Sequence, residues 1–516
     1  MEITFHGSAG TVTGSCYQLK AATKNILVDC GMYQGKKEYE QLNYKPFRFN
    51  PAEIDAVVIT HAHIDHTGLI PKLSKAGFRG KVYCTPPTKA LAEILLPDSA
   101  YIQEMEVERK NRKALRSNKE LIEPMYTLDD VERVLQSFIP VEYGEEIHIN
   151  SEFKVIFRDA GHILGSSIVE IFFNGKKIVF SGDLGRHNQP LITDPEYISE
   201  TDYLVMESTY GNRFHIQTES KRDQFARIVK KTIRKGGNLI IPSFAVERTQ
   251  EVIYILKTLM DKGEIPKLDI YLDSPLAIKA TEIFSKYPCG YDEIAQEMLS
   301  KEEDNDLFKF ENLKFSLTAE ESQKLNSIRK NAIIISASGM ADAGRIKHHL
   351  KHNLWRPEST VLFVGYQAEG TLGRRILDGN KTVRIHGEEI SVKAEVELIE
   401  GFSGHADQKD LMNWINNFKE IRECIFLVHG DNESRENMKN LIEEVSSYKV
   451  ILPELYEIID LTNFEIRYKG EAVEADKKLN ELLEGFNTKL SEYLKDPEKI
   501  KIVNDYLKDL KDKLVG

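Results

Sequence analysis

The sequence predicts an α/β protein of more than one domain, with polar side chains gathered at the ends of its strands. The chain has 516 residues, which is more than one hydrophobic core usually holds. Several apolar runs with strand character end in a histidine or a carboxylate. From about Lys221, helical and strand patterns alternate, which is typical of a parallel sheet covered by helices.

The densest group of polar residues follows the apolar run 56–59 and contains His61, His63, Asp65 and His66. In an extended loop, positions i and i+2 point to the same side, so His61 and His63 can hold one metal ion. Asp65 and His66 begin the next turn, from which they can reach a second ion. Imidazole and carboxylate donors favour zinc, ahead of manganese or iron. A solvated polar loop is the alternative interpretation.

Other strand ends carry side chains of the same kind. The runs 153–157, 177–180 and 203–206 are followed by His162, Asp183 and Glu207. Three consecutive strands with this arrangement predict a common site, whereas a single one would carry little weight. Asp29 follows the run 25–28 and can orient a ligand histidine by accepting a hydrogen bond, with a turn or cap role as the alternative.

The alternating region predicts a second α/β domain. We expect helices at 221–235, 247–262, 344–350 and 372–377, and strands at 238–241, 268–272, 332–336 and 361–364. Arginines and exposed backbone amides at strand-to-helix turns suit phosphate groups. The candidates are Ser243, Arg248, Ser338, Gly339 and Arg345. Ordinary turn and cap chemistry is the alternative for each serine.

Two further histidines follow the alternating region. His405 lies in the segment 401–407, and His429 ends the apolar run 424–428. Beyond residue 470, leucines at helical spacing on both sides of Pro497 predict a helical hairpin with one apolar stripe. We expect this stripe to pack either on the body of the protein or on a partner subunit, which would make a homodimer.

Composition limits the class of protein. The five cysteines form no C-x-x-C pair, the N-terminus has no signal-like segment, and no apolar run is long enough to span a bilayer. We therefore expect a soluble, cytoplasmic protein without a membrane partner. A net charge of −12 argues against a globally basic coat for nucleic acid, but it leaves room for a local patch. The charged stretch 98–119 predicts a helix with a solvated face.

Together these motifs resemble the metallo-β-lactamase superfamily. Asp29, the group His61-x-His63-x-Asp65-His66, His162 and Asp183 resemble its four motifs. Three further motifs resemble those of the β-CASP branch: Glu207 in Glu-Ser-Thr-Tyr-Gly, His405 in Phe-Ser-Gly-His-Ala-Asp, and His429 in Val-His-Gly. The stretches 336–340 and 344–345 resemble signatures of the inserted domain of that branch.

The resemblance implies a fold. A four-layer αββα domain (residues 1–208 and 384–460) is expected to be interrupted by a three-layer α/β β-CASP domain (209–383) and followed by a helical extension (461–516). Archaeal members carry RNA-binding KH domains ahead of the lactamase domain, whereas the resemblance here starts at the first strand.

The resemblance also implies residue roles. His61, His63 and His162 would hold the first of two zinc ions per chain, with manganese as a substitute. Asp65, His66 and His429 would hold the second, and Asp183 would bridge the two. The expected catalytic residues are Asp65, Asp183, Glu207 and His405.

The function implied is a zinc-dependent nuclease that hydrolyses RNA, single-stranded and endonucleolytically, by attack of a metal-activated hydroxide. A 5′-3′ exoribonuclease is an alternative, as is a lactamase-fold hydrolase of another ester. A scaffold subunit with a dead site is a further alternative, but such a protein would lack ligands, and here none is missing.

Overall fold

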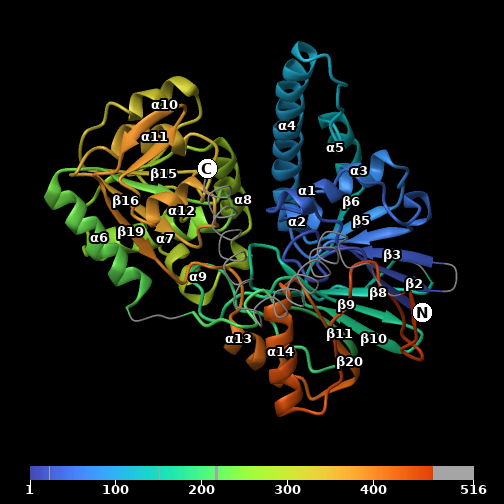
Figure 1. The fold of residues 1–516 in the computed structure, drawn as a ribbon. Helices are drawn as coiled ribbons and strands as arrows, with labels where there is room; N and C mark the ends of the chain where they lie inside the picture. The colour runs from blue at the N-terminus through green and yellow to red at the C-terminus, as the bar shows by residue number, and fades with distance from the viewer. Residues whose placement is uncertain (22–23, 150, 216–218, 469–516) are drawn as a thin grey trace, which may run out of the picture.

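Two facing sheets and a third, separate sheet form the frame of the molecule (Figure 1). The computed structural model describes residues 1–21, 24–149, 151–215 and 219–468. The facing sheets form the sandwich domain, residues 1–207 and 400–468, and the third sheet lies in the inserted domain, residues 208–399. The predicted hairpin beyond residue 470 lies outside the described residues.

The first sheet of the sandwich domain contains eight strands. In order across the sheet they are β23 (Ile466–Tyr468), β22 (Ile458–Asp460), β1 (Glu2–Phe5), β2 (Tyr17–Ala21), β3 (Lys24–Val28), β4 (Ala56–Val58), β5 (Lys81–Cys84) and β6 (Phe138–Pro140). β1 joins the two C-terminal strands to the six N-terminal ones by pairing with β22. From β3 to β6 the strands are parallel. The C-terminal ends of β3 and β4 therefore lie at one edge.

The second sheet of the sandwich domain contains seven strands. In order they are β21 (Val450–Ile451), β20 (Glu420–Val428), β11 (Glu200–Glu207), β10 (Lys176–Phe180), β9 (Ser167–Phe173), β8 (Lys154–Asp159) and β7 (Ile147–His148). β10, β11 and β20 are parallel, and β8 runs in the same direction because β9 is antiparallel to both β8 and β10. Their C-terminal ends therefore share one edge, where the predicted site residues follow.

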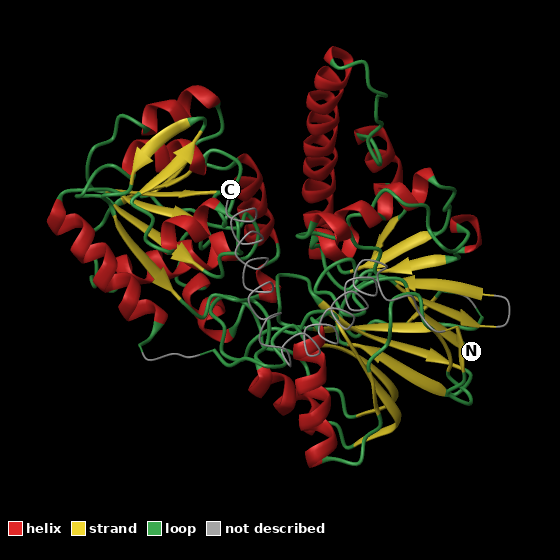
Figure 2. Cartoon of the chain, viewed as in Figure 1, coloured by secondary structure: helices red, strands yellow, loops and turns green. Residues whose placement is uncertain are grey.

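Apolar side chains between and outside the sheets explain the layers. Phe5 and Phe157 belong to the core between the two sheets. The outer face of the first sheet packs on α3 (Ile70–Lys75), α4 (Pro86–Arg116) and α5 (Leu128–Leu135). The outer face of the second sheet packs on α13 (Gln408–Asn416) and α14 (Asn432–Val445). The predicted αββα arrangement is confirmed, as Figure 2 shows.

The inserted domain has a parallel sheet between two layers of helices, as predicted. Its strands, in order, are β14 (Leu313–Phe315), β13 (Asp269–Leu272), β15 (Ala332–Ser336), β12 (Leu239–Pro242), β16 (Thr360–Val364) and β19 (Glu395–Ile399). One face is covered by α6 (Lys221–Lys235), α7 (Arg248–Asp261), α8 (Pro275–Lys286) and α9 (Glu293–Leu299). The other face is covered by α10 (Ala319–Leu325), α11 (Ile346–Asn353) and α12 (Leu372–Leu377).

Three predicted bounds of domains and helices differ from the structure by more than three residues. The sandwich domain continues to Tyr468 and does not end at residue 460, because β23 pairs with β22. The insertion ends after Ile399 and not after Val383, because β19 pairs with β16 along its whole length and the hairpin β17 (Thr382–Ile385) and β18 (Glu388–Ser391) precedes it. The helix predicted from Asp98 begins at Pro86, because the Thr85 side chain caps it by accepting a hydrogen bond from Thr88 N. The first turns of α4 are largely apolar and buried, so the pattern of charged residues from which the helix was predicted does not extend to them.

The two domains share an apolar junction. Leu164 and Ile192 of the sandwich domain lie in the same core cluster as Tyr291 of the inserted domain. α4 also packs against α8 across this junction. Among the described residues, no helix is both long and apolar enough to cross a membrane.

Candidate metal centre

The predicted ligand residues meet at the shared edge of the sandwich domain. Asp29 follows β3, His61 and His63 follow β4, and Asp65 and His66 lie in the short helix α2 (Ile64–Thr67). The remaining members follow strands of the second sheet: His162 after β8, Asp183 after β10, Glu207 at the end of β11 and His429 after β20. Neighbouring parallel strands thus bring together residues that are hundreds of positions apart in the chain.

The first group of donor atoms comes from His61, His63, His162 and Asp183. His63 Nδ1 lies 3.0 Å from His61 Nε2 and 3.3 Å from His162 Nε2. Donors around a zinc ion with bonds of about 2.0–2.1 Å and tetrahedral geometry are roughly 3.3 Å apart. Burial lowers the pKa of all three imidazoles. They are therefore neutral, which is the form that binds a metal ion.

The second group comes from Asp65, His66 and His429. His429 Nε2 lies 3.3 Å from His66 Nε2 and 3.6 Å from Asp65 Oδ2. These separations are again those of atoms that surround one ion. Thr209 Oγ1 lies 3.0 Å from His429 Nδ1 and fixes the ring from the other side.

Asp183 stands between the two groups, with one oxygen toward each. Its Oδ2 lies 3.5 Å from His61 Nε2 and 3.7 Å from His162 Nε2. Its Oδ1 lies 3.4 Å from His66 Nε2 and 3.5 Å from His429 Nδ1. Oδ1 is buried and accepts no hydrogen bond in the described part of the chain. A buried carboxylate oxygen without a donor is where a cation fits, so the residues suit a metal ion on each side of Asp183.

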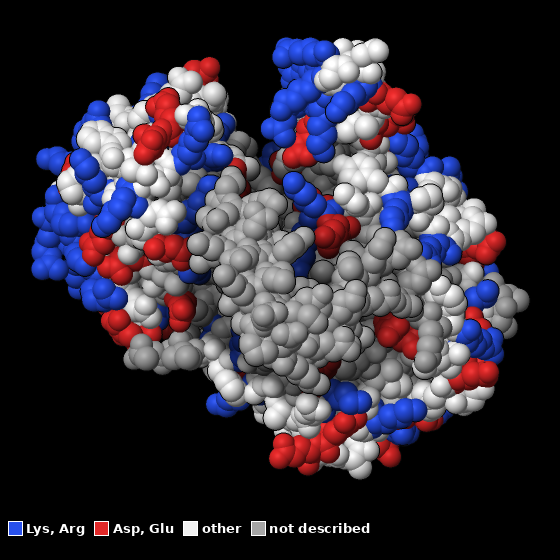
Figure 3. Space-filling model, in the orientation of Figure 1, with Lys and Arg blue, Asp and Glu red and all other residues white. Residues whose placement is uncertain are grey.

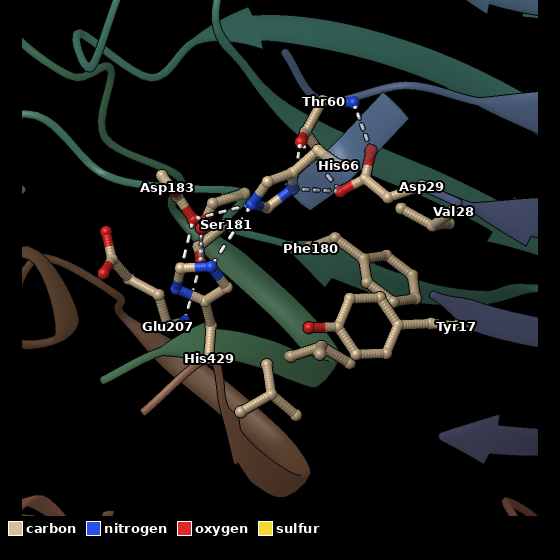
Figure 4. A pocket seen from close by; sticks show the side chains of 13 residues that line it. Tyr17, Val28, Asp29, Thr60, His66, Phe180, Ser181, Asp183, Glu207 and His429 are labelled. Atoms are coloured by element: carbon tan, nitrogen blue, oxygen red, sulfur yellow. Dashed lines mark hydrogen bonds and ion pairs between the residues drawn. The ribbon is translucent and has the colours of Figure 1, made fainter. Parts of the chain in front are cut away.

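Asp29 combines the two roles considered for it. Its Oδ2 lies 2.7 Å from His66 Nδ1 and accepts a hydrogen bond from Thr60 Oγ1 at 2.8 Å, and its Oδ1 accepts one from Thr60 N, also at 2.8 Å (Figure 4). Its backbone also has a left-handed φ of 59°, as in a tight turn. Burial opposes protonation of His66, but Asp183 and Asp29 outweigh it and hold the pKa of His66 well above its usual range. The negative charge of Asp29 and Asp183 around His66 again favours bound cations.

His405 and Glu207 form a pair at the side of the first group. Glu207 Oε2 lies 3.1 Å from His405 Nδ1, and Glu207 Oε1 accepts from the backbone N of Leu184 at 2.5 Å. Burial lowers the pKa of His405, but Glu207 and then Asp183 outweigh it and raise that pKa to about 10. Asp183, Glu207 and His405 could by spacing also hold an ion. The imidazole is 22% exposed, so it is open to a bound substrate.

The residues predicted to bind phosphate lie in the inserted domain, at the ends of β12 and β15. Ser243 is buried, and Ser338 is half-buried beside buried Gly339. Both arginines already have internal partners. Arg248 is paired with Glu251, and Arg345 donates to Asp273 Oδ1 at 2.7 Å. Their assignment to phosphate stays a prediction.

Sequence reasoning did not single out Thr60, Thr209 or the backbone of Gly404. Thr60 binds Asp29, Thr209 binds His429, and Gly404 bonds through its backbone with His162. Thr60 directly precedes His61, and Thr209 lies two residues after Glu207. A hydroxyl residue next to these motifs is the only feature of the sequence that could have indicated their roles.

A sandwich of two sheets with buried histidines and carboxylates at one edge defines a metal-dependent hydrolase. Comparison with protein families matches residues 9–221 to the metallo-beta-lactamase superfamily, 249–376 to the Beta-Casp domain and 389–453 to the Zn-dependent metallo-hydrolase RNA specificity domain. The chain therefore belongs to the β-CASP branch of the metallo-β-lactamase superfamily, and the predicted family is confirmed.

Similar proteins agree with this family. The chain is 37% identical over 433 residues to "Ribonuclease TTHA0252" of Thermus thermophilus, a match covering 84% of this chain and 94% of that protein. It is 34% identical over 450 residues to "Transcription termination factor FttA" of Methanosarcina mazei, covering 84% of this chain and 67% of that one. A crystal structure of a protein of unknown function from Enterococcus faecalis V583 shares the fold, with a TM-score of 0.53 and 14% identity over 89% of this chain and 99% of that one.

Proposed function

We propose that the protein is a zinc-dependent nuclease that cleaves single-stranded RNA endonucleolytically. The observation that carries the proposal is Asp183, whose two oxygens face two separate groups of ligand atoms. A carboxylate in this position can hold two ions side by side. Membership of the β-CASP family and the relative named as a ribonuclease, which the chain matches over 94% of its length, support RNA as the substrate.

Zinc suits the donor set. Five imidazoles and two carboxylates, without a thiolate, would hold two ions: His61, His63 and His162 one, Asp65, His66 and His429 the other, with Asp183 between. Imidazole-rich sites with carboxylate oxygens bind zinc, and manganese is a substitute. Bound ions would supply a water of lowered pKa and positive charge for the phosphoryl oxygens.

The protein side chains position the reactants and move the proton. Asp29 orients His66 through its 2.7 Å contact, and Thr209 orients His429. The departing ribose oxygen needs a proton, which neutral ligand histidines cannot provide. His405 can, because Glu207 favours its protonated form and the imidazole is partly exposed.

The inserted domain would cover the metal centre and restrict the substrate to a single strand. Gly401, at the return from the inserted domain, accepts a hydrogen bond from Arg186, three residues after Asp183. Backbone amides and serines at the ends of β12 and β15 would position phosphates, which carry no base-specific information.

One set of assays separates the candidates. Purified protein is given a linear RNA, a circular RNA, a single-stranded DNA of the same sequence and a thioester. An endoribonuclease cuts the circle, whereas a 5′-3′ exoribonuclease needs a free end and leaves it intact. Cleavage of the thioester without cleavage of either nucleic acid would overturn the proposal.

A further inference from the structure

The outer part of α4 projects from the body of the sandwich domain as an arm, residues 101–123 (Figure 1). Val107 is the last buried residue of this helix, and every residue from Glu108 to Glu123 is exposed or half-exposed. Nothing in the metal centre or the packing of the core requires the helix to continue so far.

The end of the arm carries a local concentration of positive charge, flanked by Glu104, Glu106, Glu108, Glu120 and Glu123. Six cations and no acid occur between residues 109 and 119, in a chain whose net charge is −12: Arg109, Lys110, Arg112, Lys113, Arg116 and Lys119. All six are exposed. In the space-filling view, Lys and Arg gather at the end of α4, beside a notch between the arm and the inserted domain (Figure 3).

Four of the cations form a stripe along one face of the helix. Arg109, Arg112, Lys113 and Arg116 are spaced i, i+3, i+4 and i+7, which places them on one side. Within the part of the chain that the structure describes, Arg112 pairs with Glu108 at 3.8 Å, and the other three have no ion-pair partner. An exposed pair of this kind is worth little, so the stripe is available to an external anion.

The arm is held in shape by the segment that returns from its end. Asn111 Nδ2 donates to Ile122 O, and Ile122 N donates to Asn111 Oδ1, both at 2.9 Å. Lys119 N also donates to Ala114 O. A preformed stripe loses less conformational entropy on binding than a mobile segment does.

The base of α4 is fixed to the metal centre. Thr85 Oγ1 and Thr88 Oγ1 donate to Gly165 O at 2.6 and 2.8 Å, three residues after His162. At about 1.5 Å per residue, Arg109 and Arg116 lie roughly 32 and 42 Å along the helix from Thr88. At roughly 3.4 Å per nucleotide of a stacked strand, these two distances correspond to about 9 and 12 nucleotides.

We propose that the arm binds the sugar–phosphate backbone of the RNA strand about 9 to 12 nucleotides from the bond held at the metal centre. This inference rests on the proposed function. Regularly spaced cations match the phosphates of a strand, and such contacts add affinity without base specificity. A protein partner would better suit exposed Leu115 and Leu121 at the end of the arm, but the stripe itself contains no apolar side chain.

The test removes the stripe and varies the length of the RNA. Arg109, Arg112, Lys113 and Arg116 are changed together to Gln, which keeps helix propensity and adds no negative charge. We expect kcat/KM on a 40-nucleotide RNA to fall about tenfold, and its salt dependence to become shallower by up to about 3 in log–log slope, at about 0.7 per lost phosphate contact. On an RNA of 6 nucleotides, which cannot reach the arm, kcat/KM is unchanged.

A matched control removes the same charge elsewhere. Lys230 and Arg234 lie in the last turns of α6, and Lys262 and Lys267 follow α7; all four are exposed, and their change to Gln should leave cleavage of both RNAs unaffected. An equal fall in kcat/KM on the short and the long RNA would overturn the proposal, because the substitutions would then act by disturbing the fold and not by removing contacts with the RNA. Unchanged kcat/KM on the long RNA would overturn the proposal too. Circular dichroism of the variant checks that the helix is still folded. Failure of the wild type to cut either RNA would instead contradict the proposed function.

Discussion

The pair of His405 and Glu207 predicts a general acid that can be removed without loss of metal. His405→Ala should lower the single-turnover rate on RNA about a hundredfold, or about 2.7 kcal/mol in the barrier, which is the usual size of a general-acid contribution. The metal content should stay at the wild-type value, because the seven proposed ligands remain. His187, near the surface and paired with Asp194, provides the matched control, and His187→Ala should leave the rate unchanged.

Glu207→Gln tests the charge of the pair. A full charge 3.1 Å from Nδ1 stabilises the protonated imidazole by on the order of 5 kcal/mol at an effective dielectric constant of about 20, and so raises the pKa of His405. Bound ions oppose protonation of His405 and so reduce this effect without reversing the contribution of Glu207. The acid is active below its pKa and is lost as pH rises through it. A lower pKa in Glu207→Gln therefore moves the alkaline limb of the rate profile to lower pH.

Two results would refute this reasoning. Full single-turnover activity in His405→Ala would make the histidine structural. Loss of zinc in the same variant would make His405 a ligand, as the spacing of Asp183, Glu207 and His405 allows. Inductively coupled plasma analysis of the variant, run beside the rate measurement, distinguishes the two.

Three other predictions concern the metal ligands and the C-terminal segment. Asp183→Ala should abolish activity and loosen both ions, as measured by chelator competition, and retention of one ion at wild-type affinity would argue against a bridging role. Asp29→Asn, which keeps a residue that tolerates a left-handed φ, should weaken binding of the ion held by Asp65, His66 and His429 about 10- to 100-fold because His66 loses its charged partner. Deletion of residues 471–516 should change the mass measured by light scattering, and an unchanged mass with a lowered Tm would place the apolar stripe on the protomer itself.

Much of the site could be predicted because each ligand follows its own strand. Apolar runs before Asp29, His61, Asp183 and His429 indicate strands, and parallel strands end at a common edge. The sequence also indicated the bounds of α6, which the structure reproduces. Local patterns of this kind are visible without knowledge of the partner strands.

Features that depend on distant partners could not be predicted in this way. Arg345 was expected to bind phosphate, but the sequence does not show that Asp273, buried 72 positions earlier, pairs with it. Strand β19 was assigned to the wrong domain because its pairing with β16 is not visible in its composition. The start of α4 was missed because a buried, apolar first half does not share the charge pattern of the arm.

Metal stoichiometry tests the central claim most directly. The seven proposed ligands form two groups joined through Asp183, and none is a cysteine. Elemental analysis of protein purified without added metal should give close to two equivalents per chain, with zinc dominating. A reproducible value near one equivalent, with full activity on RNA, would contradict the account.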